Sequence, residues 1–170
     1  MKEKILAHFN RWNPRYFVVV TVLILIITDL LNGLYLKLFW SNRGMSELLV
    51  RQSIGQSGLV LEDFGPDTVS EMLGFVDNTF YFFLFLILVN NLFFYIFYLL
   101  KRLWAQGYVL FYTFSASILA LTFIFDNGGL SFGWTIYNIA SIPLYLYLFL
   151  GVKMIKLKTT TIPASEKKAQ

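Results

Sequence analysis

The sequence predicts an all-α, polytopic membrane protein with four transmembrane helices and both termini in the cytoplasm. Of its 170 residues, 57% are hydrophobic and only 14% are charged, whereas soluble domains carry about 25% charged residues. Four apolar stretches are each long enough for the roughly 20 residues that cross a bilayer as a helix. Lysine and arginine gather in alternate flanking segments, which is the pattern that sets the orientation of a membrane protein.

The four spans are expected at residues 16–40, 78–100, 103–125 and 130–152. The last three contain no charged residue, and the first contains only Asp29 and Lys37 within an otherwise strongly apolar run. The runs are near-continuous and do not alternate between apolar and polar residues. They therefore indicate helices and not the short alternating strands of a membrane barrel.

The orientation follows from the positive charges beside the spans. The basic side is expected to include Lys2, Lys4, Arg11, Arg15, Lys101, Arg102, Lys153, Lys156, Lys158, Lys167 and Lys168. The loop 41–77 holds only two arginines against six carboxylates, so we expect this loop outside and both termini in the cytoplasm. The segment after Met1 has no apolar run ending in small residues, so no cleaved signal peptide is expected. The predicted location is the inner membrane of a cell, as a multi-pass protein.

Residues 1–158 are expected to form a single four-helix membrane domain, followed by a disordered tail at 159–170. In the outer loop, Ser46 is a candidate N-cap for a short helix. Asp67, which follows Gly-Pro, is a candidate cap for a helix that continues into the second span. The Gly/Ser/Gln-rich stretch 53–58 is expected to be irregular.

Composition also excludes several classes of function. The chain has no cysteine and one histidine, which excludes disulfides and thiolate chemistry. His8 has no metal-ligand partner in the sequence and is expected to be solvated, so we expect no metal and no cofactor. The basic residues are divided among three membrane-flanking segments, which does not favour nucleic-acid binding.

Asp29 is the sharpest feature inside the predicted spans. A carboxylate at that depth costs about 2.5–3.5 kcal/mol on insertion scales, and such residues mark candidate functional sites. Asn32 lies one helical turn further on the same face. Either these residues form a binding site, or Asp29 is hydrogen bonded and holds the first span against a neighbour. Lys37 is near the end of the span and can extend its ammonium group to the interface.

The other polar residues of the spans are expected mainly to join helices. Asn90 and Asn91 lie near the middle of the second span, where amides usually bond across helices. Thr113, Ala116, Ser117 and Ala120 provide small-residue spacings for close approach of the third span. Trp134, Asn138, Ser141 and Tyr145 form one stripe of the fourth span, which favours either a cavity lining or a packing face.

The residues Thr28-Asp29-Leu30-Leu31-Asn32-Gly33, Lys37 and Tyr137-Asn138-Ile139-Ala140-Ser141 resemble the bacterial lipoprotein signal peptidases (signal peptidase II). The resemblance implies a four-span peptidase fold with two catalytic aspartates. The aspartate of the last span corresponds to Ser141 here. The other corresponds either to Asp126 or, in a second alignment, to Ser131. Because an aspartic protease needs two carboxylates that share a proton, the catalytic pair Asp126 and Ser141 is incomplete.

The first functional hypothesis is therefore a diverged, catalytically defective relative that binds a lipid or lipidated peptide, or serves as a subunit of a membrane complex. Its binding residues would be Asp29, Asn32, Lys37, Trp134 and Asn138. One alternative is an active intramembrane aspartyl peptidase on lipoprotein precursors. The other is a small oligomeric transporter or channel subunit with Asp29 as its protonatable site. The expected partners are membrane lipids, a lipidated peptide or other membrane proteins.

Overall fold

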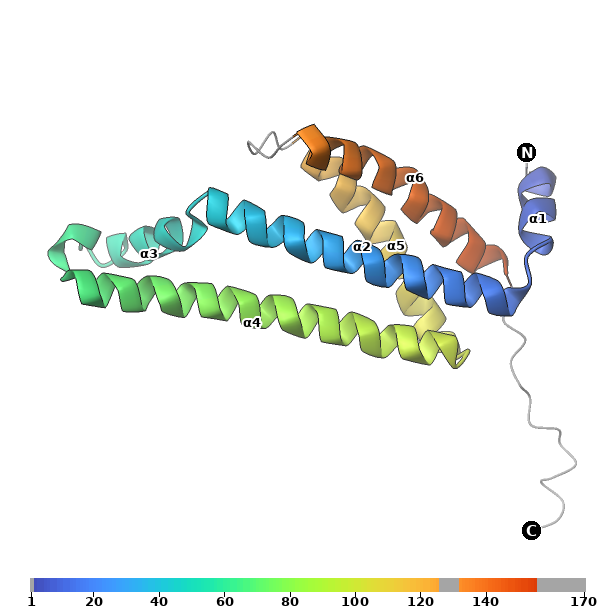
Figure 1. Ribbon diagram of the computed structural model, residues 1–170, viewed down its shortest axis with the longest axis horizontal. Helices are drawn as coiled ribbons and strands as arrows, with labels where there is room; N and C mark the ends of the chain where they lie inside the picture. Colours follow the sequence, from blue (N-terminus) through green and yellow to red (C-terminus); the bar gives the residue numbers. More distant parts are fainter. Residues whose placement is uncertain (1, 126–131, 156–170) are drawn as a thin grey trace, which may run out of the picture. The chain divides into compact units, whose positions relative to one another are not determined.

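The computed structural model describes residues 2–125 and 132–155, and these residues form helices joined by short turns, without a strand. The helices are α1 (Lys2–Asn10), α2 (Pro14–Asn42), α3 (Met45–Gly55), the 3-10 turn η1 (Leu61–Asp63), α4 (Pro66–Leu99), α5 (Leu103–Phe125) and α6 (Phe132–Met154) (Figure 1). By length and composition, α2, α4, α5 and α6 can cross a membrane. The predicted class, an all-α chain with four candidate membrane helices, is confirmed.

The long helices extend beyond the predicted spans at some of their ends. α4 begins at Pro66, beside the expected helix start at Asp67 and well before the span expected from residue 78, and at about 1.5 Å per residue it is roughly 51 Å long. The hydrocarbon core is only about 30 Å thick. The early turns of α4 contain Asp67, Glu71 and Asp77, so these charged turns belong outside the hydrocarbon.

Two details of the connecting loop differ from the prediction. α3 begins at Met45, one residue before the predicted cap Ser46, and the chain instead turns through Gly44 with φ 56°. Glycine adopts this left-handed conformation at little cost. Helical structure continues to Gly55, so the stretch expected to be irregular is partly helical. α4 begins one residue before Asp67, whose carboxylate lies in the first turn and complements the helix dipole.

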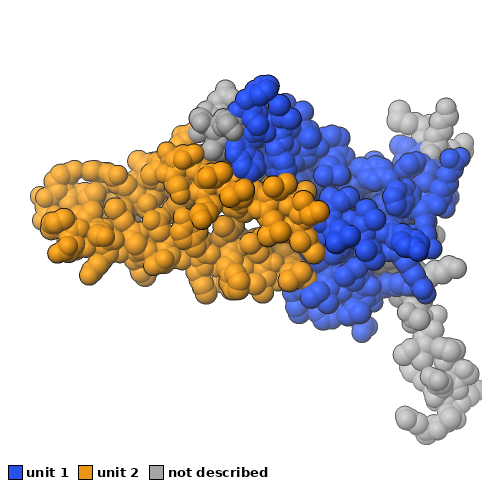
Figure 2. Space-filling model, viewed as in Figure 1, with its two compact units in different colours: residues 1–25, 93–127, 131–170 blue, residues 26–92, 128–130 orange. Residues whose placement is uncertain are grey.

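The chain divides into two compact units, which are coloured separately in Figure 2. Unit 1 contains the described residues of 1–25, 93–127 and 131–170. Unit 2 contains residues 26–92 and the segment 128–130, which lies outside the described residues.

In unit 2, the later part of α2 lies antiparallel to α4, side by side along the pair (Figure 1). Higher residue numbers on α2 meet lower numbers on α4. The pairs are Asp29 with Asn91, Gly33 with Leu88, Lys37 with Tyr81, and Trp40 with Phe80. Polar and aromatic contacts therefore recur along the whole pair.

In unit 1, α5 packs against α6. The small residues of α5 predicted to allow close helix approach are all buried, namely Thr113, Ala116, Ser117 and Ala120. Thr113 donates its hydroxyl to the carbonyl of Val109 at 2.8 Å, which satisfies that group inside its own helix. At one end of the helix pair, the side chain of Gln106 donates to the carbonyl of Val152 at 2.8 Å.

The short helix α1 docks on α6, also within unit 1. Phe9 is only 3% exposed and its ring lies 5.1 Å from that of Tyr147 and 5.9 Å from that of Phe17. Gly151 of α6 lies against these rings, and any side chain at this position would overlap Phe17 and Phe9. Because glycine has no side chain, Gly151 leaves room for the rings of Phe9 and Phe17.

Candidate functional site

The buried polar centre of unit 2 is a hydrogen bond between two helices. Asn91 of α4 donates from Nδ2 to Oδ2 of Asp29 on α2 over 3.0 Å. Asp29 is 6% exposed and Asn91 is 3% exposed. A buried polar group costs free energy unless it is hydrogen bonded. This bond therefore offsets part of the cost of burying both side chains between the helices.

The neighbours of this pair have different surroundings. Asn32, one turn after Asp29, is half-buried, whereas Asn90, next to Asn91, is exposed. Lys37 is exposed, and its ammonium nitrogen lies 5.9 Å from the centre of the Tyr81 ring, within cation–π range. The structure thus places Asp29 and Lys37 against different residues of α4.

The end of the α2–α4 pair that carries Trp40 is fixed by two contacts of that side chain. The indole Nε1 donates to Oδ1 of Asp77 at 2.7 Å. The indole ring also stacks on Phe80, with centroids 4.0 Å apart and planes within 10°. Because the carboxylate accepts the only polar hydrogen of the indole, the rest of Trp40 presents an apolar surface.

A pocket of about 270 Å³ opens beside Trp40. It is lined by Trp40, Leu49, Phe75, Val76, Thr79, Phe80 and Phe83, which come from α2, α3 and α4. Thr79 donates its hydroxyl to the carbonyl of Phe75 at 2.8 Å, inside its own helix. The two side chains of the lining that have polar atoms, Trp40 and Thr79, therefore use their donors elsewhere, and the pocket suits an apolar ligand.

The connection between α3 and α4 has an exposed ion-pair cluster. Arg51 donates from Nε to Glu47 at 2.9 Å and from Nη1 to Glu62 at 2.8 Å. The hydrogen bond from Arg51 lowers the pKa of Glu62, and the same bond is the main reason that the pKa of Arg51 is raised. Asp63 accepts from the backbone N–H of Val60 at 3.0 Å and holds η1 in place.

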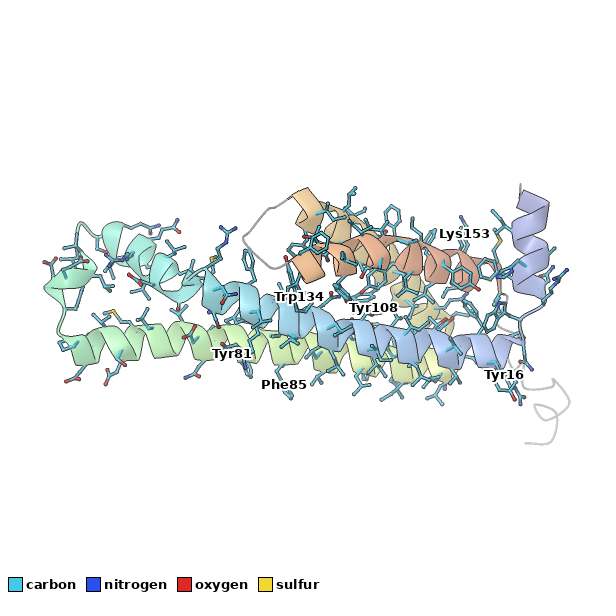
Figure 3. All side chains as sticks on the ribbon, turned by 45° about the horizontal axis from the view of Figure 1, so that its top comes forward. Tyr16, Tyr81, Phe85, Tyr108, Trp134 and Lys153 are labelled. Atoms are coloured by element: carbon cyan, nitrogen blue, oxygen red, sulfur yellow. The ribbon has the colours of Figure 1, made fainter. Side chains whose placement is uncertain are left out.

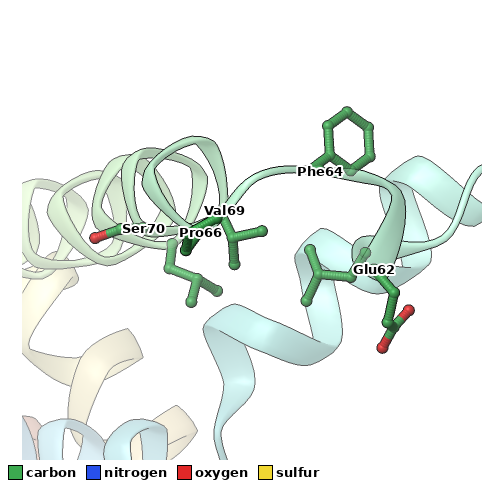
Figure 4. A pocket seen from close by; sticks show the side chains of 7 residues that line it. Glu62, Phe64, Pro66, Val69 and Ser70 are labelled. Carbon is green, nitrogen blue, oxygen red and sulfur yellow. The ribbon is translucent and has the colours of Figure 1, made fainter.

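A second hollow, of about 460 Å³, lies where this connection meets α4 (Figure 4). Glu62 and Phe64 line it from the connection, and Pro66, Val69 and Ser70 line it from the first turns of α4. The carboxylate of Glu62 is already engaged by Arg51. The lining of this hollow is therefore mainly apolar. The described residues that line it provide no acid–base pair for catalysis.

The polar stripe predicted for the last span is present on α6 in unit 1. Asn138, Ser141 and Tyr145 are all buried. The hydroxyl of Ser141 donates to the carbonyl of Tyr137 at 2.8 Å, four residues back in the same helix. Trp134 is half-buried and its ring meets that of Tyr137 edge to face at 5.6 Å.

The predicted site residues belong to both units. Asp29, Asn32 and Lys37 belong to unit 2, whereas Trp134, Asn138 and Ser141 belong to unit 1. The candidate catalytic residue Asp126 and the alternative Ser131 lie outside the described residues. Ser141 donates to a backbone carbonyl, and Asp29 accepts from the amide of Asn91.

Sequence reasoning missed the contacts that join residues far apart in the chain. It left the pair Trp40 and Asp77 unconnected, although an indole at the end of one span and a carboxylate before the next was a usable signal. It also treated His8 as simply solvated. His8 is exposed, but its Nε2 lies 3.1 Å from the hydroxyl of Tyr147 on α6.

Among the described residues, no group of three or more histidine, cysteine or carboxylate side chains is arranged to hold a metal ion. No protein-family model, curated protein or solved structure matches this chain in comparisons with known proteins.

Proposed function

We propose that this chain is a non-catalytic integral membrane protein that binds the acyl chain of a lipid or lipidated peptide. In this proposal it is a diverged relative of the lipoprotein signal peptidases that its sequence resembles. The observation that carries the binding function is the apolar pocket beside Trp40. Four candidate membrane helices and the incomplete catalytic pair support the same reading.

The pocket chemistry favours a hydrocarbon ligand. Its lining is aromatic and aliphatic apart from Trp40 and Thr79, whose donors are bonded to Asp77 and to a backbone carbonyl. A polar ligand would lose its water without gaining a partner, which is costly. An acyl chain that leaves water gains about 0.8 kcal/mol for each methylene that it buries.

The contacts of the polar side chains support a non-catalytic role. An aspartic peptidase needs two carboxylates that share one proton. Asp29 is hydrogen bonded to an amide, and Ser141, at the position of a family aspartate, gives its hydroxyl to its own helix. These side chains are thus engaged in holding helices together and in satisfying the backbone.

The proposal is tested by filling the pocket. Val76 lines the pocket, whereas Val89, on the same helix, is exposed and does not line it. We expect Val76→Trp to weaken binding of a fluorescent acylated peptide at least about tenfold, equivalent to about 1.4 kcal/mol. Val89→Trp, the matched control, should leave the affinity unchanged.

Binding is measured in nanodiscs, with the same peptide lacking its acyl chain as the ligand control. Equal binding of the acylated and non-acylated peptides would exclude an acyl-chain site. Equal affinities in the wild type and in the Val76→Trp variant would exclude this pocket.

A further inference from the structure

A third hollow, of about 440 Å³, lies in unit 1 where α1 meets the start of α2. It is lined by His8, Arg11, Trp12, Asn13 and Tyr16. Tyr16 projects outward from the first turn of α2 (Figure 3) and is 70% exposed. We name this set of five residues the junction hollow.

The junction hollow is held in place by the docking of α1. The ring of Trp12 meets that of the buried Phe17 edge to face at 5.8 Å. His8 bonds to the hydroxyl of Tyr147, and Phe9, the next residue, is buried among aromatic rings. The packing of Phe9 and Trp12 therefore holds the backbone that carries the lining side chains, which reduces the entropic cost of binding.

The hollow presents hydrogen-bond donors and a positive charge. Arg11 provides guanidinium donors and makes no ion pair with a described carboxylate. The carboxamide oxygen of Asn13 accepts from the backbone N–H of Arg15 at 3.0 Å, which leaves the amide NH₂ of Asn13 as a donor. The indole N–H of Trp12 and the hydroxyl of Tyr16 are further donors. This combination suits a phosphate group.

The charge around the hollow is also strongly one-sided. Between residue 1 and Asp29, the only acidic residue is Glu3, against Lys2, Lys4, Arg11 and Arg15. Segments of this kind beside a membrane are attracted to anionic lipids, at about 1 kcal/mol for each lysine or arginine near the surface. Tryptophan and tyrosine prefer the level of the lipid headgroups, and the apolar run of α2 begins directly after Tyr16.

We propose that the junction hollow binds the phosphate of an anionic phospholipid headgroup. Arg11 provides the charge, the donors of Trp12, Asn13 and Tyr16 face the phosphate oxygens, and the acyl chains continue along the apolar start of α2. A lipid is favoured over free phosphate because the apolar run of α2 begins directly after Tyr16. A lipid can therefore place its phosphate in the hollow and its acyl chains along α2, whereas free phosphate gains only the first contact. This inference does not depend on the acyl-chain pocket, which belongs to unit 2.

The experiment uses a chain that keeps Trp12 as its single tryptophan, with Trp40, Trp104 and Trp134 replaced by phenylalanine. Energy transfer from Trp12 to a dansyl-labelled lipid is measured in nanodiscs, with either an anionic or a zwitterionic labelled headgroup. We expect preferential transfer to the anionic lipid, because a zwitterionic headgroup carries the same phosphate together with an ammonium group that the charge of Arg11 repels. Arg11→Gln should reduce that preference about fivefold, equivalent to about 1 kcal/mol.

Arg15→Gln is the matched control, because it removes the same charge from the same segment but does not line the hollow. Arg11→Lys keeps the positive charge and should retain most of the preference. This variant therefore shows whether Arg11→Gln acts through loss of charge or through a change in folding. An equal loss in Arg15→Gln would show general surface attraction and overturn the site. Absence of any preference in the wild type, or displacement of the labelled lipid by millimolar inorganic phosphate, would overturn the lipid assignment.

Discussion

Asn91 donates a 3.0 Å hydrogen bond to Asp29 between two helices, and both side chains are buried. This bond explains how a carboxyl group is accommodated within the most hydrophobic stretch of the chain. It also identifies Asn91 as a polar residue that joins the two helices. The next residue back along α4, Asn90, is exposed.

The first prediction is a coupling between these two residues. Asn91→Leu leaves the carboxyl group of Asp29 without this donor, and we expect a loss of about 1–3 kcal/mol in the free energy of unfolding. The double variant Asp29→Leu/Asn91→Leu should recover part of that loss, since hydrogen bonds between membrane helices contribute about 0.6–1.7 kcal/mol. Unfolding in detergent provides the measurement. Additive effects of the two single changes would contradict the bond.

The second prediction compares two glycines. Gly151→Ala should destabilise the docking of α1, because the added methyl group overlaps Phe17 and Phe9. Overpacking of this kind typically costs about 1–3 kcal/mol. Gly107→Ala meets no atom within 4 Å and should stabilise α5 by about 0.5–1 kcal/mol. Thermal unfolding in detergent would show opposite shifts, and a stabilising Gly151→Ala would refute the described packing.

The third prediction concerns pH. Arg51 lowers the pKa of Glu62, so the folded loop holds this proton less tightly than the unfolded chain does. The contribution of Glu62 is therefore fully present above its unfolded pKa and is lost as the pH falls through its lower folded pKa. Carboxyl NMR titration should show the pKa of Glu62 rising in Arg51→Gln. High salt should weaken the effect because the pair is exposed. An unchanged titration in Arg51→Gln would contradict the ion pair.

The fold class and the positions of α2, α5 and α6 follow from the sequence. A bilayer requires each span to be apolar and about 20 residues long, and such stretches can be recognised in the sequence. α5 covers the predicted range 103–125, since charged residues lie just before it and at residue 126. The second span is predicted at 78–100 because Asp77 is taken as its boundary, and a helix beginning near Asp67 is expected to continue into it; α4 is one continuous helix from Pro66 to Leu99. A charged residue does not end a helix, because the backbone hydrogen bonds continue past it. A charge marks only where the hydrocarbon of the membrane ends.

The candidate site was predictable only in part. The position of Asp29 within an apolar run indicated that it needs a partner, and a neighbouring helix supplies it. The sequence could not show that Asn91 bonds to Asp29, because this contact depends on the rotation of α4. The pocket beside Trp40 was missed since its lining is ordinary apolar residues from three helices, which share no spacing in the chain.

The central claim, that the protein binds an acylated ligand without cleaving it, is tested most directly with an intact lipoprotein precursor in liposomes. Bound precursor and cleaved product are quantified together for the wild type, Val76→Trp and Asp126→Asn. We predict that the wild type retains uncleaved precursor, that Val76→Trp loses it, and that Asp126→Asn behaves as the wild type. Cleavage by the wild type that disappears in Asp126→Asn would contradict the account and establish an active peptidase.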